Sequence, residues 1–370
     1  MYCDYLIVGA GVFGATVARK LAEAGYKCIV IDKRDTVGGN CADHQECGIT
    51  IHDYGAHIFH TNDLNVWLFV NRFSQFVQYQ HNVKANTGKK ITSLPFNMNT
   101  FYDLFGATTP EQAKRAIDKD MDAIDISKLE GLEKRAIGLV GPTIFNELVK
   151  EYTEKQWGKS CSEIDPSVIG RLPLRFTWDN NYFNDYFQGL PFVGYSYMVQ
   201  NMLEHENIQT ILQCEYKQFP YAPVKKTIYC GPIDEFFDYK FGELEYRSLE
   251  FRTEWLPVDN FQGCPVMNYT KHDVPYTRII EHKHFKKQHT NSTAITFEYP
   301  KKWQQGDEPY YPIKDERNME LYHKYAEYAM KERPDVIFGG RLGMYAYFNM
   351  DKAICKALAL AEAEILNEDS

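Results

Sequence analysis

The sequence predicts an α/β fold with a Rossmann-like domain, an inserted helical bundle and an antiparallel β-sheet domain. Three observations support this prediction. The chain opens with a strand, a glycine-rich turn and a helix; the region from about 100 to 186 has mainly helical patterns; and β patterns dominate from about 227. Because the closing strand and helix resemble the opening pair in kind, we expect interwoven domains rather than domains joined in series.

The first 32 residues contain the clearest elements. Leu6-Ile7-Val8 is a continuous apolar run, as expected for a strand that is buried on both faces of a parallel sheet. A helical period follows from Val12 to Ala24 and stops at Gly25. Cys28-Ile29-Val30-Ile31 is typical of a second buried strand. Together these segments predict a strand–helix–strand unit.

The turn inside this unit has the pattern Gly9-x-Gly11-x-x-Gly14, and Asp32 ends the second strand roughly 20 residues later. This combination is typical of a dinucleotide site. Gly9 permits the tight turn, Gly11 lets the backbone approach a pyrophosphate, and Gly14 lets helix and strand pack closely. The helix N-terminus attracts phosphate, and Asp32 is expected to accept hydrogen bonds from ribose hydroxyls. A glycine-rich turn in another kind of α/β protein is the alternative.

Two further glycine pairs favour FAD over NAD as the dinucleotide. Gly38-Gly39-Asn40 follows the second strand and the basic pair Lys33-Arg34, an arrangement typical of FAD enzymes of the glutathione-reductase type. Gly339-Gly340-Arg341 lies at a late strand end, just before the last helix. Contacts from both ends of the chain suit a cofactor as long as FAD.

The middle and late segments complete the expected elements. Asn86-Thr87-Gly88 indicates a hairpin within residues 78–96, and Thr109-Pro110 is a good helix start, with a hydroxyl cap and a proline at the first helical position. The region from about Thr100 to Tyr186 is expected to be helical and includes an amphipathic helix at 144–152. Strands are expected at 227–230, 246–251, 276–280, 293–299 and 336–338, with a terminal helix at 351–366.

Length and composition limit the class of protein. The 370 residues suggest two or three packed units, and 44% hydrophobic with 25% charged residues is ordinary globular usage. A net charge of −9 argues against a general nucleic-acid binder. The nine cysteines include no CxxC pair, which disfavours a disulfide framework or zinc site and fits a reducing cytosol. With no basic leader and no apolar stretch of about 20 residues, we expect a cytoplasmic protein that does not insert into membranes.

Several longer motifs resemble the bacterial UDP-galactopyranose mutase family. One is similar to the family's flavin-facing loop, Tyr54-Gly55-Ala56-His57-Ile58-Phe59-His60-Thr61-Asn62. The match covers nearly the whole chain, from about Tyr5 to Asp351, in the family's order. The other motifs are Leu94-Pro95-Phe96-Asn97-Met98-Asn99-Thr100, Tyr152-Thr153-Glu154-Lys155-Gln156-Trp157-Gly158, Val274-Pro275-Tyr276-Thr277-Arg278-Ile279-Ile280-Glu281-His282, Glu308-Pro309-Tyr310-Tyr311-Pro312 and Phe338-Gly339-Gly340-Arg341-Leu342.

The resemblance implies both architecture and activity. It implies a discontinuous FAD-binding domain at 1–77, 190–240 and 330–370, a helical domain with a mobile substrate loop at 98–189, and an antiparallel sheet domain at 78–97 and 241–329. The implied reaction is the reversible ring contraction of UDP-galactopyranose to UDP-galactofuranose, which supplies galactofuranose for surface glycans. The FAD must be reduced, because its nitrogen displaces UDP and holds the sugar as a covalent adduct. The sequence has no glycosidase-like carboxylate pair and no Ser/His/Asp or Cys/His signature, which fits a cofactor nucleophile.

The motifs also imply the roles of single residues. Arg171, on the mobile loop, and Arg278, its fixed partner, are expected to hold the diphosphate, because a guanidinium fork binds phosphate oxygens and keeps its charge. For any one arginine a surface ion pair is the alternative. His57 lies where the family places a histidine against the flavin, and it is the third catalytic candidate. Trp157 resembles the tryptophan of the substrate channel.

Further contacts are implied for substrate and cofactor. Tyr182 resembles the residue that stacks on uracil, although a tyrosine can also be a core aromatic. The other expected substrate contacts are Tyr152, Thr153, Asn268, Tyr311, Tyr347 and His60. The expected FAD contacts are Gly9, Gly11, Phe13, Gly14, Asp32, Lys33, Gly39, Asn40, Gly340, Arg341 and Met350, with the charge of Arg341 favouring the anionic reduced flavin.

The expected partners are UDP-galactose in both ring forms, NAD(P)H or another reductant, and a second copy of the chain as a homodimer. No nucleic acid is expected. No metal site is expected either, because the spacing of His57 and His60 and the sequence His282-Lys283-His284 do not suggest a ligand set.

One residue departs from the family's pattern. The family usually has Tyr-x-Asp-Met in its last motif, whereas this chain has Tyr347-Phe348-Asn349-Met350. Asn349 keeps the size and hydrogen bonding but not the charge, which bears on turnover rate or substrate preference, and Asp351 is expected to point elsewhere. Three alternatives stay open: a UDP-N-acetylgalactosamine mutase, a flavin oxidoreductase of the amine-oxidase type, and a non-catalytic nucleotide-sugar-binding protein.

Overall fold

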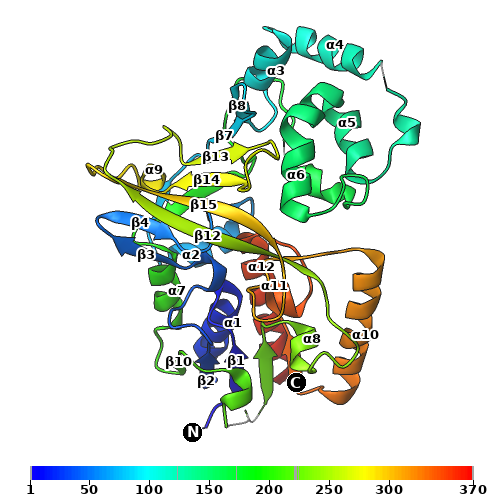
Figure 1. Cartoon of the computed structure of the whole chain (residues 1–370). Coiled ribbons are helices and arrows are strands. Elements are labelled where there is room, and N and C mark those ends of the chain that lie inside the picture. Colours follow the sequence, from blue (N-terminus) through cyan, green and yellow to red (C-terminus); the bar gives the residue numbers. More distant parts are fainter. Residues whose placement is uncertain (1, 123, 172, 221–222, 224, 369–370) are drawn as a thin grey trace.

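The computed structural model describes residues 2–122, 124–171, 173–220, 223 and 225–368, without the side chains of 170, 171, 367 and 368. A parallel sheet lies at one end of the molecule, a larger sheet crosses its middle, and a helical bundle lies at the far end (Figure 1). The expected fold class is therefore confirmed.

The first sheet has five strands, and all of its neighbouring strands pair in parallel. Its centre is β1 (Tyr5–Val8), between β2 (Cys28–Ile31) and β11 (Lys226–Tyr229), with β10 (Ile208–Ile211) and β17 (Val336–Phe338) at the edges. The predicted strands 5–8, 28–31 and 336–338 are confirmed. Because the strands are parallel, all five carboxyl ends meet at the same edge, where the glycine-rich turns follow β1 and β17.

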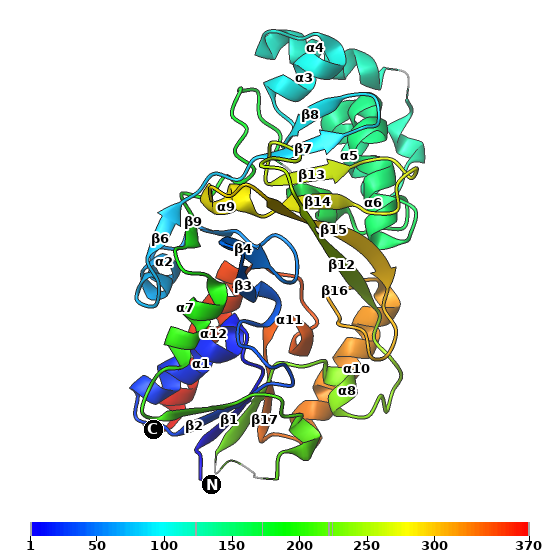
Figure 2. The ribbon, with the colours of Figure 1, turned by 60° about the vertical axis from the view of Figure 1, so that its left-hand side comes forward.

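Helices cover this sheet. The predicted first and last helices, α1 (Val12–Glu23) and α12 (Met350–Glu368), pack against each other, and α1 also contacts α7 (Tyr195–Leu203). Figure 2 shows these three helices side by side. The remaining helices of this end are α8 (Ile233–Phe236), α10 (Glu316–Glu332) and α11 (Gly340–Gly343).

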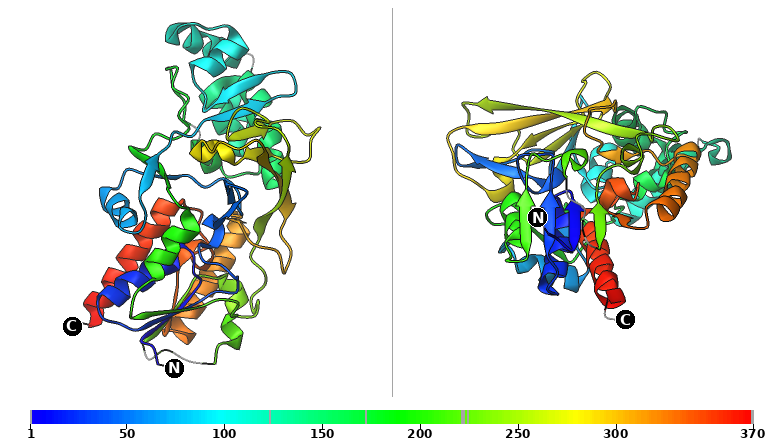
Figure 3. Two further views of the ribbon diagram at one scale, coloured as in Figure 1. Left: turned by 90° about the vertical axis from the view of Figure 1, so that its left-hand side faces the viewer. Right: turned by 90° about the horizontal axis from the view of Figure 1, so that it is seen from below.

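The second sheet has seven strands in the order β16-β12-β15-β14-β13-β7-β8 and crosses over the first (Figure 3). All pairs are antiparallel except β13 with β7, so the expectation of a purely antiparallel sheet is wrong for that one pair. The predicted hairpin at Asn86-Thr87-Gly88 is confirmed. The strands are β7 (Val83–Asn86), β8 (Ile91–Leu94), β12 (Tyr246–Leu256), β13 (Val266–Tyr269), β14 (Arg278–Glu281), β15 (Thr293–Lys302) and β16 (Tyr311–Pro312).

The helical bundle contains α3 (Met98–Phe105), α4 (Pro110–Met121), α5 (Gly131–Ile144) and α6 (Lys150–Trp157), and a π-helical turn over Phe145–Val149 joins the last two. The predicted start of α4 is confirmed, because the Thr109 hydroxyl accepts a hydrogen bond from the Gln112 N–H.

The expectation of helix as far as Tyr186 is wrong. The last helical turn is a 3₁₀ turn at Pro166–Arg171, and residues 173–186 are irregular. In this segment Arg175 donates through Nε to Asn184 Oδ1 at 2.9 Å and through Nη2 to the Phe183 carbonyl at 2.8 Å. Asp179 accepts from the Asn181 N–H at 2.9 Å. Such local side-chain bonds to the backbone compete with helix formation.

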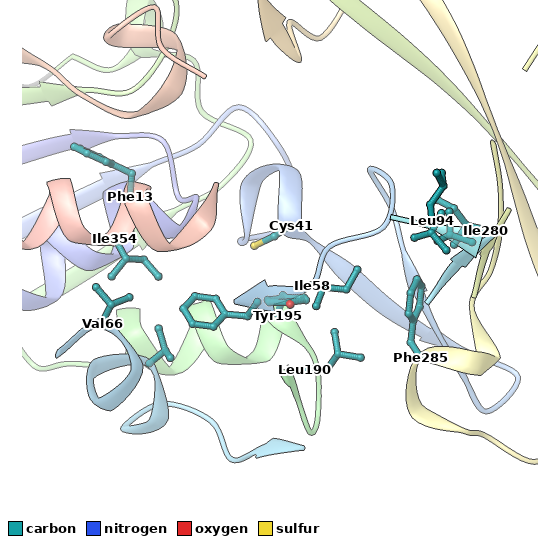
Figure 4. Close-up of a cluster of buried hydrophobic side chains, with 14 of the residues drawn as sticks. Phe13, Cys41, Ile58, Val66, Leu94, Leu190, Tyr195, Ile280, Phe285 and Ile354 are labelled. Carbon is teal, nitrogen blue, oxygen red and sulfur yellow. The ribbon is translucent and has the colours of Figure 1, made fainter. Parts of the chain in front are cut away.

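Short elements connect the two sheets. They are β3 (Asp43–Glu46), β4 (Ile49–His52), β5 (Phe59–Thr61), α2 (Leu64–Asn71), β6 (Phe76–Gln78), β9 (Phe187–Pro191) and α9 (Lys283–Lys286). One buried hydrophobic cluster passes between them, from Phe13 and Ile354 through Ile58 and Tyr195 to Ile280 (Figure 4). Among the described residues, no helix has both the length and the apolar character needed to cross a membrane.

Candidate active site

The turn after β1 brings backbone segments unusually close together. A Cβ atom on Gly14 would lie 2.0 Å from the Gly9 carbonyl oxygen, so only glycine lets α1 begin there. A Cβ on Gly11 would face the Cα of Gly39 at 3.7 Å, and Gly9 itself has a φ of +114°. The start of α1 and the second glycine pair therefore form one glycine-lined surface, where the first N–H groups of the helix are available to a phosphate.

Asp32 has a structural role in this turn. Its two carboxylate oxygens accept the backbone N–H groups of Ala10 at 2.7 Å and Arg34 at 2.9 Å. The N–H of Gly38 donates to the Ala10 carbonyl at 2.9 Å. These bonds hold together the turn after β1, the end of β2 with Arg34, and the segment at Gly38. Each carboxylate oxygen can accept more than one hydrogen bond, so a ribose contact by Asp32 stays a prediction.

A pocket opens along this edge of the parallel sheet, and the structure places all of the expected FAD contacts in its lining, together with His57 and Asn349. Residues that the sequence interpretation did not assign also line it. Tyr229 ends the neighbouring strand β11 and Cys230 follows it, a position that only the strand order reveals. The expected contacts in the lining are Gly9, Gly11, Phe13, Gly14, Asp32, Lys33, Gly39, Asn40, Gly340, Arg341 and Met350.

Arg34 is another unassigned residue in this lining, and its charge suits an anionic ligand. Its Nη2 contacts Glu308 at 2.8 Å and Asn40 Oδ1 at 2.7 Å, and the guanidinium lies 4.3 Å from the centre of the Tyr54 ring. Burial alone lowers the pKa of Arg34, but Glu308, Tyr54 and Asp32 outweigh it and raise the pKa. Its buried Nη1 has no hydrogen-bond partner among the described residues. The glycine-lined turn and this free donor fit the diphosphate of FAD.

A second group of site residues lies under the seven-stranded sheet. Arg278, on β14, donates through Nε to Glu298 Oε2 at 2.7 Å, and Glu298 is fully buried on β15. Burial opposes the charge of Arg278, but Glu298, Tyr152 and Tyr311 raise its pKa above the ordinary value. Within the described residues, Nε is the only guanidinium nitrogen of Arg278 with a hydrogen bond, so the rest of the fork can face a ligand.

Aromatic side chains join this group to the pocket. The ring of Trp157, at the end of α6, lies 6.2 Å from that of Tyr311, and Tyr311 lies 5.2 Å from Tyr347. Arg341, which lines the pocket, lies 5.2 Å from the centre of the Tyr347 ring. Burial raises the pKa of Tyr152 and of Tyr311, so both phenols keep their protons and can donate a hydrogen bond to a phosphate oxygen.

The remaining substrate candidates lie on neighbouring elements. Asn268, on β13, is paired with Arg278 in the sheet register, and its buried Oδ1 has no partner among the described residues. Thr153 is buried on α6 between Tyr152 and Trp157. Tyr182 donates its backbone N–H to the His81 carbonyl at 2.8 Å. Arg171 ends the 3₁₀ turn, and its side chain lies outside the described part of the chain.

The two histidines of the flavin-facing motif differ in environment. His57 Nδ1 lies 2.8 Å from the Gly55 carbonyl, and burial lowers the pKa of His57 to about 4. His60 contacts Asp185 through Nδ1 at 2.6 Å and stacks on Phe183 at 3.8 Å. The Asn349 amide lies 3.4 Å from His60 Nε2. Asp185 was not predicted, because it lies more than a hundred residues away in the irregular segment.

Two further expectations bear on the site. Asp351 does point elsewhere, because its Oδ2 accepts from the Thr61 hydroxyl at 3.5 Å. Asn349 lines the pocket, whereas Asp351 does not. Within residues 2–122, 124–171, 173–220, 223 and 225–368, no group of three His, Cys, Asp or Glu side chains is arranged to hold a metal ion.

Comparisons with known proteins show which families and structures this chain resembles. A family model described as UDP-galactopyranose mutase matches residues 147–347, and one described as an NAD(P)-binding Rossmann-like domain matches residues 7–73. A probable UDP-galactopyranose mutase of Klebsiella pneumoniae is 40% identical over 97% of this chain and 94% of its own length. A dTDP-fucopyranose mutase of Escherichia coli is 39% identical over 98% of both chains. A crystal structure of reduced UDP-galactopyranose mutase superposes with a TM-score of 0.74 and 15% identity, covering 98% of this chain and 93% of that one.

Proposed function

The chain belongs to the UDP-galactopyranose mutase family and is a pyranose–furanose isomerase; on this premise we propose that it interconverts UDP-galactopyranose and UDP-galactofuranose with reduced FAD. The observation that supports this proposal best is the continuity of the site. The chain of side chains Trp157, Tyr311, Tyr347 and Arg341 leads from the Arg278 group to the glycine-lined pocket. A nucleotide sugar held by Arg278 would therefore present its sugar to a cofactor in that pocket.

The chain's own residues would bind, orient and stabilise charge. Arg278 stays protonated beside Glu298 and offers its terminal N–H groups to the diphosphate, which gains charge when UDP departs. The neutral phenols of Tyr152 and Tyr311 donate to the same oxygens. Asn268 has a free buried carbonyl that can accept from a nucleotide N–H or hydroxyl. Reduced FAD would supply the nucleophilic nitrogen that attacks the anomeric carbon.

Other parts of the functional assignment are also proposals. We propose that NAD(P)H or another reductant reduces the flavin, that the chain works as a homodimer, and that its product supplies galactofuranose for surface glycans. Loss of galactofuranose from the glycans of a deletion strain would support the last point, and an unchanged glycan would contradict it.

A second candidate substrate is dTDP-fucopyranose. The relative that acts on this sugar is almost as similar to the chain as the probable UDP-galactopyranose mutase. In addition, Asn349 stands at the pocket where the family usually has aspartate. The N-acetylated substrate, UDP-N-acetylgalactosamine, also stays open.

The deciding experiment is chromatography of sugar nucleotides incubated with FAD-loaded protein, with and without dithionite. The furanose forms of UDP-galactose, dTDP-fucose and UDP-N-acetylgalactosamine are compared at equal concentration. We expect the highest kcat/KM for UDP-galactofuranose and conversion only after reduction. Faster conversion of another sugar would reassign the substrate. Failure of all three with folded, reduced, FAD-loaded protein would refute the proposal and leave a non-catalytic binding protein.

A further inference from the structure

A chain of buried polar groups runs from the seven-stranded sheet to the segment that carries His57. The Thr296 hydroxyl, on β15, lies 2.7 Å from Nε2 of His282. Nδ1 of His282 accepts the backbone N–H of His52 at 3.2 Å, and Nδ1 of His52 accepts the backbone N–H of His57 at 3.1 Å. Thr296, His282 and His52 are 1%, 0% and 2% exposed, so water cannot replace any of these contacts.

The directions of these hydrogen bonds fix the protonation of both rings. A backbone N–H can only donate, so Nδ1 of His52 and Nδ1 of His282 must both carry a free lone pair. Each ring is therefore neutral, with its hydrogen on Nε2. His282 then donates a hydrogen bond to the Thr296 hydroxyl. The Thr296 hydroxyl can in turn donate to the Thr253 hydroxyl at 2.8 Å.

The surroundings favour the same neutral state. Burial lowers the pKa of His282 to about 3, with His44 as a further, unfavourable positive neighbour. Burial lowers the pKa of His52 as well, and the basic groups His282, His57, Lys286 and His81 around it act in the same direction. The His52 ring is also stacked on Phe285, with centroids 4.7 Å apart and planes at 8°.

The series of hydrogen bonds ends at His57, which lies at the pocket. The Gly55 carbonyl can only accept, so the His57 ring donates from Nδ1 at 2.8 Å and leaves Nε2 as a bare acceptor. His57 lines the pocket. Gly55 has a φ of +94°, and a Cβ there would lie 3.3 Å from Oε2 of Glu298, the partner of Arg278. The segment from His52 to His57 is therefore fixed between the second sheet and the pocket.

We propose that His52 and His282 are positioning residues for the reaction, which hold the His57 segment at the FAD pocket through a one-directional chain of hydrogen bonds. This inference rests on the proposed function in that it assigns the pocket to FAD. Neither residue touches the pocket, so each acts through the backbone of the next.

The test compares three variants of the FAD-loaded protein with the wild type. His52→Phe keeps a ring against Phe285 but leaves the buried His57 N–H without an acceptor, whereas His52→Asn offers an amide oxygen near the position of Nδ1. Phe285→Leu is the matched control, because it removes the stacked ring and keeps the hydrogen bond. The measurements are the dissociation constant of FAD, the flavin absorption spectrum, the melting temperature, and kcat and KM.

We expect His52→Phe to weaken FAD binding and lower kcat by on the order of tenfold, since an unsatisfied buried donor costs about that factor. KM should change less than about twofold, because Arg278 and Asn268 lie on other elements. His52→Asn should recover most of the loss, and Phe285→Leu should lower the melting temperature alone. Wild-type FAD affinity and spectrum in His52→Phe would overturn the proposal, as would equal effects in Phe285→Leu.

A second measurement does not depend on variants or on turnover. Nitrogen-15 NMR of histidine-labelled wild-type protein at pH 7 should show Nδ1 unprotonated and Nε2 protonated for both His52 and His282. A protonated Nδ1 in either ring would refute the proposed series of hydrogen bonds, whatever the variants do. If the wild type converts no sugar nucleotide, the proposed function fails, while FAD affinity and the NMR pattern still decide this inference.

Discussion

Replacement of Gly14 by alanine tests the dinucleotide turn most directly. Gly14 is helical, so its backbone conformation suits alanine, but the new Cβ would lie 2.0 Å from the Gly9 carbonyl oxygen and 3.0 Å from Cγ2 of Ile7. Ordinary contacts begin near 3.4 Å, so α1 and the turn would have to separate by about 1.4 Å. Overpacking of this kind costs about 1–3 kcal/mol, and a displacement of this size in a binding site can cost on the order of 100-fold.

The assay is titration of the apoprotein with FAD, followed by flavin fluorescence, alongside a melting curve of each variant. We expect Gly14→Ala to weaken FAD binding at least tenfold and to lower the melting temperature. The matched control is Gly138→Ala: Gly138 is exposed in α5, and nothing lies within 4 Å of its Cβ position. That change should stabilise the protein by up to about 1 kcal/mol. Wild-type FAD affinity in Gly14→Ala would refute the reasoning.

Three further outcomes are expected. Arg278→Lys keeps the charge but loses the planar fork beside Glu298. The KM for the sugar nucleotide should therefore rise about tenfold in steady-state kinetics, while FAD loading stays unchanged. An unchanged KM would argue against a diphosphate contact. Asn349→Asp restores the carboxylate that the family usually has at this position, 3.4 Å from His60 Nε2, so the ratio of kcat/KM between the furanose forms of UDP-galactose and dTDP-fucose should shift; an unchanged ratio would contradict a role of this residue in substrate preference. His282 stays neutral in the fold with a pKa of about 3, against about 6.5 when unfolded, so its contribution to stability is complete above pH 6.5. As the pH falls below 6.5 the unfolded chain takes up the proton, so the free energy of unfolding should drop by up to about 1.4 kcal/mol per pH unit. Chemical denaturation from pH 7 to 5 measures this drop, which should be shallower in His282→Asn than in the wild type.

The sequence was sufficient where neighbours in the chain are also neighbours in space. The turn at Gly9, Gly11 and Gly14 and the strands on either side of α1 lie within residues 5–31, so a local pattern predicted them. The start of α4 at Thr109 depends only on the next few residues. The long motifs extended this to expected FAD contacts at both ends of the chain, and the structure places all of these residues in one pocket.

Local patterns failed at two places in the fold. The segment 173–186 contains residues that can form a helix, but the side chains of Arg175 and Asp179 bind its backbone instead. The parallel pairing of β7 with β13 joins residues about 180 positions apart, and no hydrophobic period reveals it.

The sequence by itself determined the dinucleotide turn, the family and the set of residue types available for binding phosphate, because each depends on an ordered run of neighbouring residues. Only the tertiary structure decided which charges meet. It paired Arg278 with Glu298, Arg34 with Glu308 and His60 with Asp185. It also decided the protonation of His52 and His282, since burial and the direction of a hydrogen bond exist only once strands from different parts of the chain are packed together.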